Sequence, residues 1–226
     1  MLFSDEDDAL PFRDRSEAGR ILGAKLAPTY SGANILVLAL PRGGAVVASE
    51  ISHILRTPLK VFLVRKLKAR DDPELALGAI AQGGTLVLDS TVVERLHISE
   101  TEVHSAQVQA GQELAAMQAC YAEHVCSSDL FGKCVILVDD GAAGGSTLRA
   151  AALALRKTNV ARIVIAIPVA PLSVYYLLHK VADEVVCLAA PEPFFAISQW
   201  YEKFEQVPEE DVLTLLRKTK ALAKAA

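Results

Sequence analysis

Short, largely apolar runs occur at five places along the chain and predict buried strands. Such runs are typical of strands with both faces covered, because successive side chains then contact apolar groups on opposite sides of a sheet. The runs cover residues 35–40, 59–64, 135–138, 162–167 and 184–188.

Between and around these runs, apolar residues recur three and four positions apart, which predicts amphipathic helices. The predicted helices cover residues 17–27, 45–55, 99–125, 147–157, 173–182 and 208–223. Ser16 is the expected N-cap of the first helix, and Ser99 with Glu102 forms a capping box at the longest one. The alternation predicts an α/β fold, with a mostly parallel, Rossmann-like central sheet flanked by helices.

A helical and hairpin elaboration is expected between the second and third strands. Residues 76–81 and 85–88 flank a Gln-Gly-Gly turn, which predicts a β-hairpin, and the long helix follows it. No repeat or low-complexity linker interrupts the chain. We therefore expect a single domain over residues 1–226, with its core at about 30–70 and 130–190 and an insertion at about 71–130.

Composition narrows the class of protein. The formal net charge is -4 and the pI about 5.8, so no basic nucleic-acid footprint is evident. No apolar run reaches the length of about 18 residues expected of a membrane span, and residues 1–8 do not resemble a signal peptide. The four cysteines have no zinc-site spacing. These features predict a cytoplasmic protein without nucleic-acid or membrane partners, and they leave a homodimer open.

The loop after the third long apolar strand carries most of the expected chemistry. Asp139 and Asp140 leave the strand, glycines follow at 141, 144 and 145, and a helix begins soon after. Glycine-rich turns and helix N-termini bind anions through backbone N–H groups. The carboxylates would instead accept hydrogen bonds from sugar hydroxyls or hold Mg²⁺ through water. A turn that only caps a helix would explain the glycines but not the two carboxylates.

The segment from Val138 to Thr147 resembles the phosphoribosyl pyrophosphate (PRPP) signature of type I phosphoribosyltransferases. The resemblance implies that Asp139 and Asp140 contact the ribose hydroxyls, with Mg²⁺ held through water and PRPP and by no direct protein ligand. The residues that would surround the 5-phosphate are Ala142, Ala143, Gly144, Gly145, Ser146 and Thr147. Gly144 departs from the family pattern, which usually has threonine there, and one hydroxyl contact is therefore lost.

Two further loops match this interpretation. The resemblance implies that Arg42, Gly43 and Gly44 bind pyrophosphate, partly through unusual backbone geometry. Arg65 and Lys66 are expected to leave the second strand at the same edge of the sheet and to stabilise the departing negative charge as catalytic cations. The alternative for them is an ordinary solvated pair at a strand end. Residues 68–73 are a candidate lid.

Nearly the whole chain is similar to a subgroup of bacterial and archaeal predicted phosphoribosyltransferases. The matching segments are residues 12–19, 40–44, 65–67, 73–79, 138–147 and 193–204. In this fold, residues 1–28 and 191–226 would form a hood over the acceptor. Arg13 and Arg15 either belong to that hood or form an exposed basic pair. The aromatic residues Trp200, Tyr201 and Phe204 either stack on a base or, as we favour, belong to the core.

Two functions remain open from the sequence. The first is an enzyme, a pentosyltransferase of nucleotide metabolism that uses Mg²⁺ and PRPP as donor and releases pyrophosphate. The alternative is a non-catalytic regulatory module that binds PRPP or a nucleotide, which Gly144 and the acidic pair Asp71 and Asp72 favour. No residue pattern identifies the acceptor.

Overall fold

A five-stranded parallel sheet forms the centre of the computed structural model, which describes residues 10–30, 32, 34–70, 75–126 and 130–225. All four neighbouring pairs are parallel. In spatial order the strands are β2 (Leu59–Val61), β1 (Ile35–Ala39), β6 (Cys134–Val138), β7 (Arg162–Val169) and β8 (Glu184–Ala189). The prediction of a parallel α/β fold is therefore confirmed.

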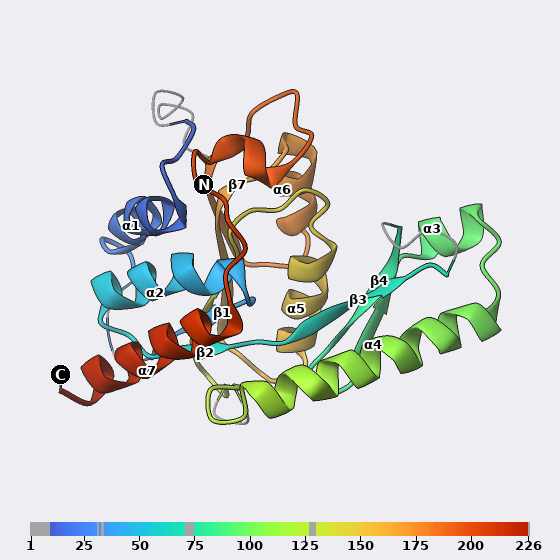
Figure 1. Cartoon of the computed structure of the whole chain (residues 1–226), viewed down its shortest axis with the longest axis horizontal. Coiled ribbons are helices and arrows are strands. Elements are labelled where there is room, and N and C mark those ends of the chain that lie inside the picture. The colour runs from blue at the N-terminus through green and yellow to red at the C-terminus, as the bar shows by residue number, and fades with distance from the viewer. Residues whose placement is uncertain (1–9, 31, 33, 71–74, 127–129, 226) are drawn as a thin grey trace.

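Helices cover both faces of this sheet (Figure 1). Alternate side chains of a strand point to opposite faces, and they pack into two separate apolar clusters. On one face lie α1 (Arg15–Leu26), α2 (Gly43–Leu55) and α7 (Glu209–Ala225). On the other face lie α5 (Ser146–Arg156) and α6 (Leu172–Leu178).

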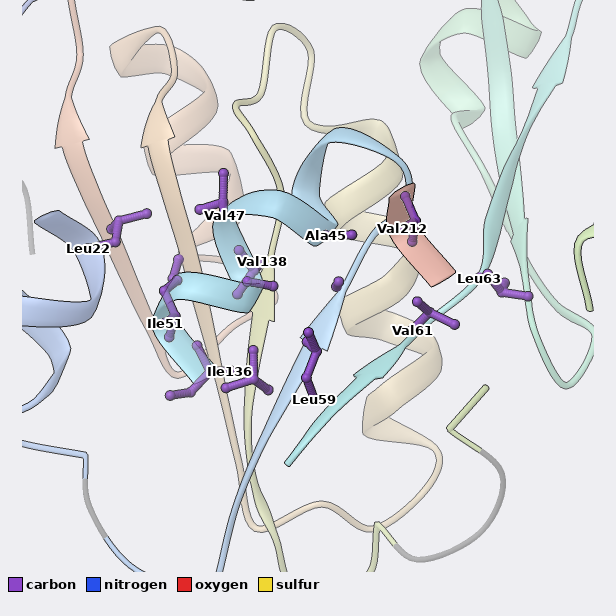
Figure 2. Close-up of a cluster of buried hydrophobic side chains, with 14 of the residues drawn as sticks. Leu22, Ala45, Val47, Ile51, Leu59, Val61, Leu63, Ile136, Val138 and Val212 are labelled. Carbon is purple, nitrogen blue, oxygen red and sulfur yellow. The ribbon is translucent and has the colours of Figure 1, made fainter. Parts of the chain in front are cut away.

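The first of these clusters joins the central sheet to the N- and C-terminal helices. Figure 2 shows Val47 of α2 near Val138 of β6, Leu22 of α1 at the side of α2, and Val212 of α7 above the edge strand β2. All four side chains are fully buried. Burying such a side chain contributes about 1.5–3 kcal/mol, so this cluster holds α1 and α7 on one face of the sheet.

A second sheet extends from the side of the first as an arm (Figure 1). It is antiparallel, in the order β3 (Val64–Lys68), β4 (Ala76–Ala81) and β5 (Thr85–Leu88), and it carries α3 (Ser90–Arg95) and α4 (Glu100–Cys120). The predicted hairpin and long helix are confirmed. Residues 71–73 of the candidate lid lie outside the described residues.

The prediction of one strand over residues 59–64 is wrong. Parallel pairing with β1 ends at Val61, and β3 begins at Val64 in the other sheet. Between them, Leu63 exchanges hydrogen bonds with Gln82, donating to its side-chain oxygen at 2.9 Å and accepting from its backbone N–H at 2.8 Å. Phe62 and Leu63 are buried at this junction, so the apolar run continues although the pairing partner changes.

The N-cap of α1 also differs from the prediction. Asp14, and not Ser16, accepts a hydrogen bond from the backbone N–H of Glu17 at 2.8 Å. The capping role of Ser99 at α4 is confirmed, because its hydroxyl accepts from the backbone N–H of Glu102 at 3.2 Å. The first helix therefore begins earlier than its apolar pattern, at Arg15.

Both end segments of the described chain meet beside the central sheet. The backbone of Phe12 donates to Trp200 at 2.9 Å and accepts from Glu202 at 2.8 Å. Trp200 ends a short 3-10 helix (Ile197–Trp200) that follows β8. Among the described residues, no helix is both long and apolar enough to cross a membrane.

Candidate functional site

A small cavity lies at the carboxyl end of β6. Its volume is about 150 Å³, and it is lined by Lys66, Asp139, Asp140, residues 141–148 and Ile197. In parallel sheets, ligands bind outside the carboxyl ends of the strands. The predicted acid pair and the predicted phosphate loop therefore line the same cavity.

Two glycines give the loop its shape. Gly141 and Gly145 have φ values of 153° and 70°, which side chains rarely adopt. A Cβ atom on Gly141 would lie 2.7 Å from a methyl group of Ile197, and one on Gly145 would lie 2.9 Å from Val174. Gly145 is the N-cap of α5, so the unpaired N–H groups of the first helical turn border the cavity and can bind an anion.

The two aspartates are electrostatically unequal. Asp139 accepts a hydrogen bond at 2.9 Å from the backbone N–H of Asp140. Burial, and then the charge of Asp140, raise the pKa of Asp139 well above its ordinary value, and Lys66 opposes this shift. Asp140 instead has a direct cation, because Arg15 Nε lies 2.6 Å from its Oδ2 atom.

The loop after β1 packs directly against the acid pair. A Cβ atom on Gly43 would overlap the Asp140 carboxylate, and one on Gly44 would lie 2.8 Å from the Cα atom of Asp139. Only glycine permits so close an approach of the two loops. The preceding peptide bond, Pro41–Arg42, is cis, which agrees with the unusual backbone geometry expected there. Arg42 is exposed at the start of α2.

Arg65 and Lys66 are separated by the alternation of β3. Lys66 lines the cavity, whereas the Nε atom of Arg65 lies 3.6 Å from a carboxylate oxygen of Glu113 on α4. The sequence predicted that the two residues follow the end of a strand. In the structure both lie inside β3. Of the two cations, the structure brings only Lys66 to the predicted site.

Two residues near the acid pair belong to the end segments of the chain. Besides Arg15, Tyr201 contacts Asp140, donating from its hydroxyl to the Asp140 backbone carbonyl at 2.7 Å. Tyr201 is buried and packs against Phe12 and Phe204, with ring centroids 5.6 Å and 5.1 Å away. Its place in the core agrees with the interpretation that we favoured from the sequence.

Comparison with known proteins identifies the family. Residues 16–203 match the family model described as "Phosphoribosyl transferase domain". The chain belongs to this family. Two Mycobacterium tuberculosis proteins, from strains CDC 1551 and H37Rv, carry phosphoribosyl transferase as a provisional name. Each is 38% identical over 205 residues, which are 91% of this chain but 46% of the relative. This phosphoribosyl transferase domain thus spans about half the length of those relatives.

A solved structure shares the fold of this phosphoribosyl transferase domain. The crystal structure of TT1426 from Thermus thermophilus is 35% identical, with a TM-score of 0.78. The match covers 92% of this chain and 99% of that one.

The donor atoms of the cavity at the carboxyl end of β6 suit a hard cation held indirectly. Within the described part of the chain, no group of three or more His, Cys, Asp or Glu side chains could hold a metal ion. Asp139 and Asp140 nevertheless supply carboxylate oxygens beside the glycine-rich loop. Mg²⁺ keeps several waters and is commonly bound by one or two carboxylates together with substrate phosphates, so these residues fit the ion.

Proposed function

We propose that this phosphoribosyl transferase domain binds Mg²⁺ and PRPP and transfers the phosphoribosyl group to an acceptor, releasing pyrophosphate. The observation that carries the proposal is the shared cavity, in which two carboxylates adjoin a glycine-rich helix N-terminus. A ribose 5-phosphate unit has a diol that can donate hydrogen bonds to the carboxylates and a phosphate that can bind at the helix N-terminus. We propose the same activity for any longer protein that contains this domain.

Each loop has a role in the proposed reaction. Asp139 and Asp140 accept hydrogen bonds from the ribose hydroxyls, and residues 142–147 bind the 5-phosphate. Arg42 and the backbone of Gly43 and Gly44 bind the pyrophosphate group. The bond from pyrophosphate to ribose C1 breaks, and its electron pair leaves with the pyrophosphate oxygen. A nucleophilic atom of the acceptor forms the new bond to C1 and loses its proton to solvent. Bound Mg²⁺ would supply further positive charge to the pyrophosphate.

Charge stabilisation is the main catalytic contribution in this proposal. As the C1–oxygen bond breaks, positive charge develops on the ribose ring and negative charge on the leaving group. The carboxylates stabilise the positive charge on the ribose ring, and Lys66 stabilises the negative charge on the leaving group. These fixed charges in a partly enclosed site need little reorganisation during the reaction. We leave Arg65 out of this role, since its side chain contacts Glu113.

The alternative is a module that binds PRPP or a nucleotide without turnover. Gly144 favours it, because one hydroxyl contact to the phosphate is absent from the loop. The acceptor would be a small molecule in the catalytic case. A screen of bases and small amines for pyrophosphate release separates the two functions: binding of PRPP without release for every acceptor tested would favour the module.

Thermal unfolding tests the proposed ligand. Mg²⁺ with PRPP should raise the melting temperature of the wild-type protein, because a ligand that binds only the native state stabilises it. The double change Asp139→Asn with Asp140→Asn should abolish the rise. Asp211→Asn on α7, an exposed acidic residue outside the cavity, is the control and should keep it. No wild-type shift at millimolar PRPP would contradict the proposal.

The proposed location is the cytoplasm. In the described part of the chain, which includes Cys120, Cys126, Cys134 and Cys187, no disulfide bond is formed. Cysteines that remain reduced are typical of a reducing compartment. A disulfide-dependent melting temperature in the purified protein would argue against this location.

A further inference from the structure

Arg15 and Asp140 form an ion pair that is largely shielded from water. Their closest atoms are 2.6 Å apart, and their side chains are 11% and 14% exposed. The other surface pairs of the same helix are more exposed, as in Arg20 with Glu50 at 46% and 28%. Because shielding from water strengthens a charged contact, the Arg15–Asp140 pair fixes the carboxylate more firmly than a surface pair would.

Three contacts on three sides hold the Arg15 guanidinium. Besides its bond to Asp140, it donates from Nη1 to the backbone carbonyl of Glu205 at 2.9 Å. Its Cζ atom lies 3.7 Å from the centre of the Phe204 ring, a cation–π contact. Such a planar group with several fixed donors leaves its partner little freedom.

The surroundings of Asp140 leave no space for another position of its carboxylate on the Gly43 side. A Cβ atom on Gly43 would overlap Asp140 Oδ2 and lie 2.9 Å from Arg15 Nε. From the other direction, the hydroxyl of Tyr201 binds the backbone carbonyl of Asp140. The carboxylate is thus enclosed by α1, the start of α2 and the segment after β8.

Arg15 does not itself line the cavity that contains the acid pair. It lines a separate cavity of about 510 Å³ between α1 and the start of α7, with Asp14, Val46 and Lys203. A ligand in the smaller cavity would therefore meet Asp140 and not Arg15. Any effect of Arg15 on that ligand would act through the carboxylate.

We propose that Arg15 is a positioning residue, which holds one oxygen of Asp140 so that the carboxylate is fixed for a ribose hydroxyl. The proposal rests on the proposed function, because it requires a ribose-bearing ligand at the acid pair. It assigns to the N-terminal helix a role in sugar binding, separate from phosphate binding by residues 142–147.

Two probes separate the sugar contact from the phosphate contact. Isothermal titration calorimetry measures the Kd of ribose 5-phosphate and of inorganic phosphate for the wild type, Arg15→Met, Arg15→Lys and the control Arg20→Met. Arg15→Met should raise the Kd of ribose 5-phosphate about tenfold, equivalent to about 1.4 kcal/mol, and leave that of phosphate unchanged. Arg15→Lys should restore part of the loss, and Arg20→Met should match the wild type.

The outcomes distinguish the two proposals. If the wild type binds neither ribose 5-phosphate nor Mg²⁺ with PRPP, the proposed function fails and this inference with it. If the wild type binds and Arg15→Met has the same affinity for ribose 5-phosphate, only the role of Arg15 is overturned. A parallel loss of both probes without rescue by lysine would show a merely structural role. If Arg15→Met does not fold, Arg15→Lys is the deciding variant. A higher Kd for ribose 5-phosphate with an unchanged Kd for phosphate would support the role of Arg15, and two unchanged Kd values would overturn it.

Discussion

Gly144 and Gly145 are neighbours in the proposed phosphate-binding loop, and their steric surroundings differ. No atom lies within 4 Å of a Cβ atom placed on Gly144, and its backbone is not in the left-handed region. Gly145 has a φ of 70°, and its Cβ atom would lie 2.9 Å from Val174. The loop therefore requires glycine at 145 but not at 144, where the family usually has threonine.

Gly144→Thr should tighten the binding of Mg²⁺ with PRPP. A hydrogen bond to a charged group is worth about 1.5–3 kcal/mol, so we expect about a tenfold lower Kd by isothermal titration calorimetry. The matched variant Gly145→Thr should instead destabilise the protein by at least about 1 kcal/mol, because a side chain in the left-handed region is strained. An unchanged Kd in Gly144→Thr would show that this position does not contact the phosphate.

Asp139 makes the stability of the protein depend on pH. Since the folded state raises the pKa of Asp139, the folded protein holds this proton above pH values at which the unfolded chain has lost it. The free energy of unfolding should therefore fall as the pH rises from the ordinary pKa of 3.8 through the raised value.

Asp139→Asn should remove this contribution. In urea unfolding near pH 8, the variant should be more stable than the wild type, because the neutral amide avoids the cost of a buried charge beside Asp140. It should at the same time lose the stabilisation by PRPP. Equal stability of the two proteins from about pH 4 to about pH 8 would contradict the raised pKa.

Strand β3 shows how an element can bring one residue to a site and keep its neighbour away. The sequence predicted Arg65 and Lys66 at a strand end, where both could face the ligand. Because β3 instead pairs with β4, its side chains alternate between two faces. The change of partner at residues 62 and 63 depends on Gln82, 19 positions from Leu63, and no local pattern reveals such a contact.

Substitution of the two cations should have different effects. Lys66→Gln should weaken the binding of Mg²⁺ with PRPP about tenfold, because a positive charge beside the acid pair and the proposed phosphate-binding loop is lost. Arg65→Gln should leave binding unchanged and reduce stability by at most about 1 kcal/mol, the usual range for a partly exposed ion pair. Calorimetry and thermal unfolding measure the two effects. If Arg65→Gln weakened binding more than Lys66→Gln does, Arg65 and not Lys66 would be the cation that contacts the ligand.

At the scale of the whole molecule, local patterns predicted the central sheet, its covering helices and the loop at residues 139–147. These features depend on apolar periodicity and on glycine, which are visible in the sequence. The contacts that were missed join residues far apart: Arg15 lies 125 positions from Asp140, and Tyr201 lies 61 positions from it. Only the folded chain, with Phe12, α1 and Tyr201 in one cluster on the same face of the sheet, brings them to the acid pair.

The most direct test of the central claim is a crystal structure with Mg²⁺ and PRPP bound. We predict that the ribose hydroxyls lie within hydrogen-bond distance of Asp139 and Asp140. The 5-phosphate should accept hydrogen bonds from the backbone N–H groups of residues 143–147. A ribose and phosphate bound away from the cavity at the end of β6, or a phosphate on the loop with the sugar turned away from both carboxylates, would contradict the account.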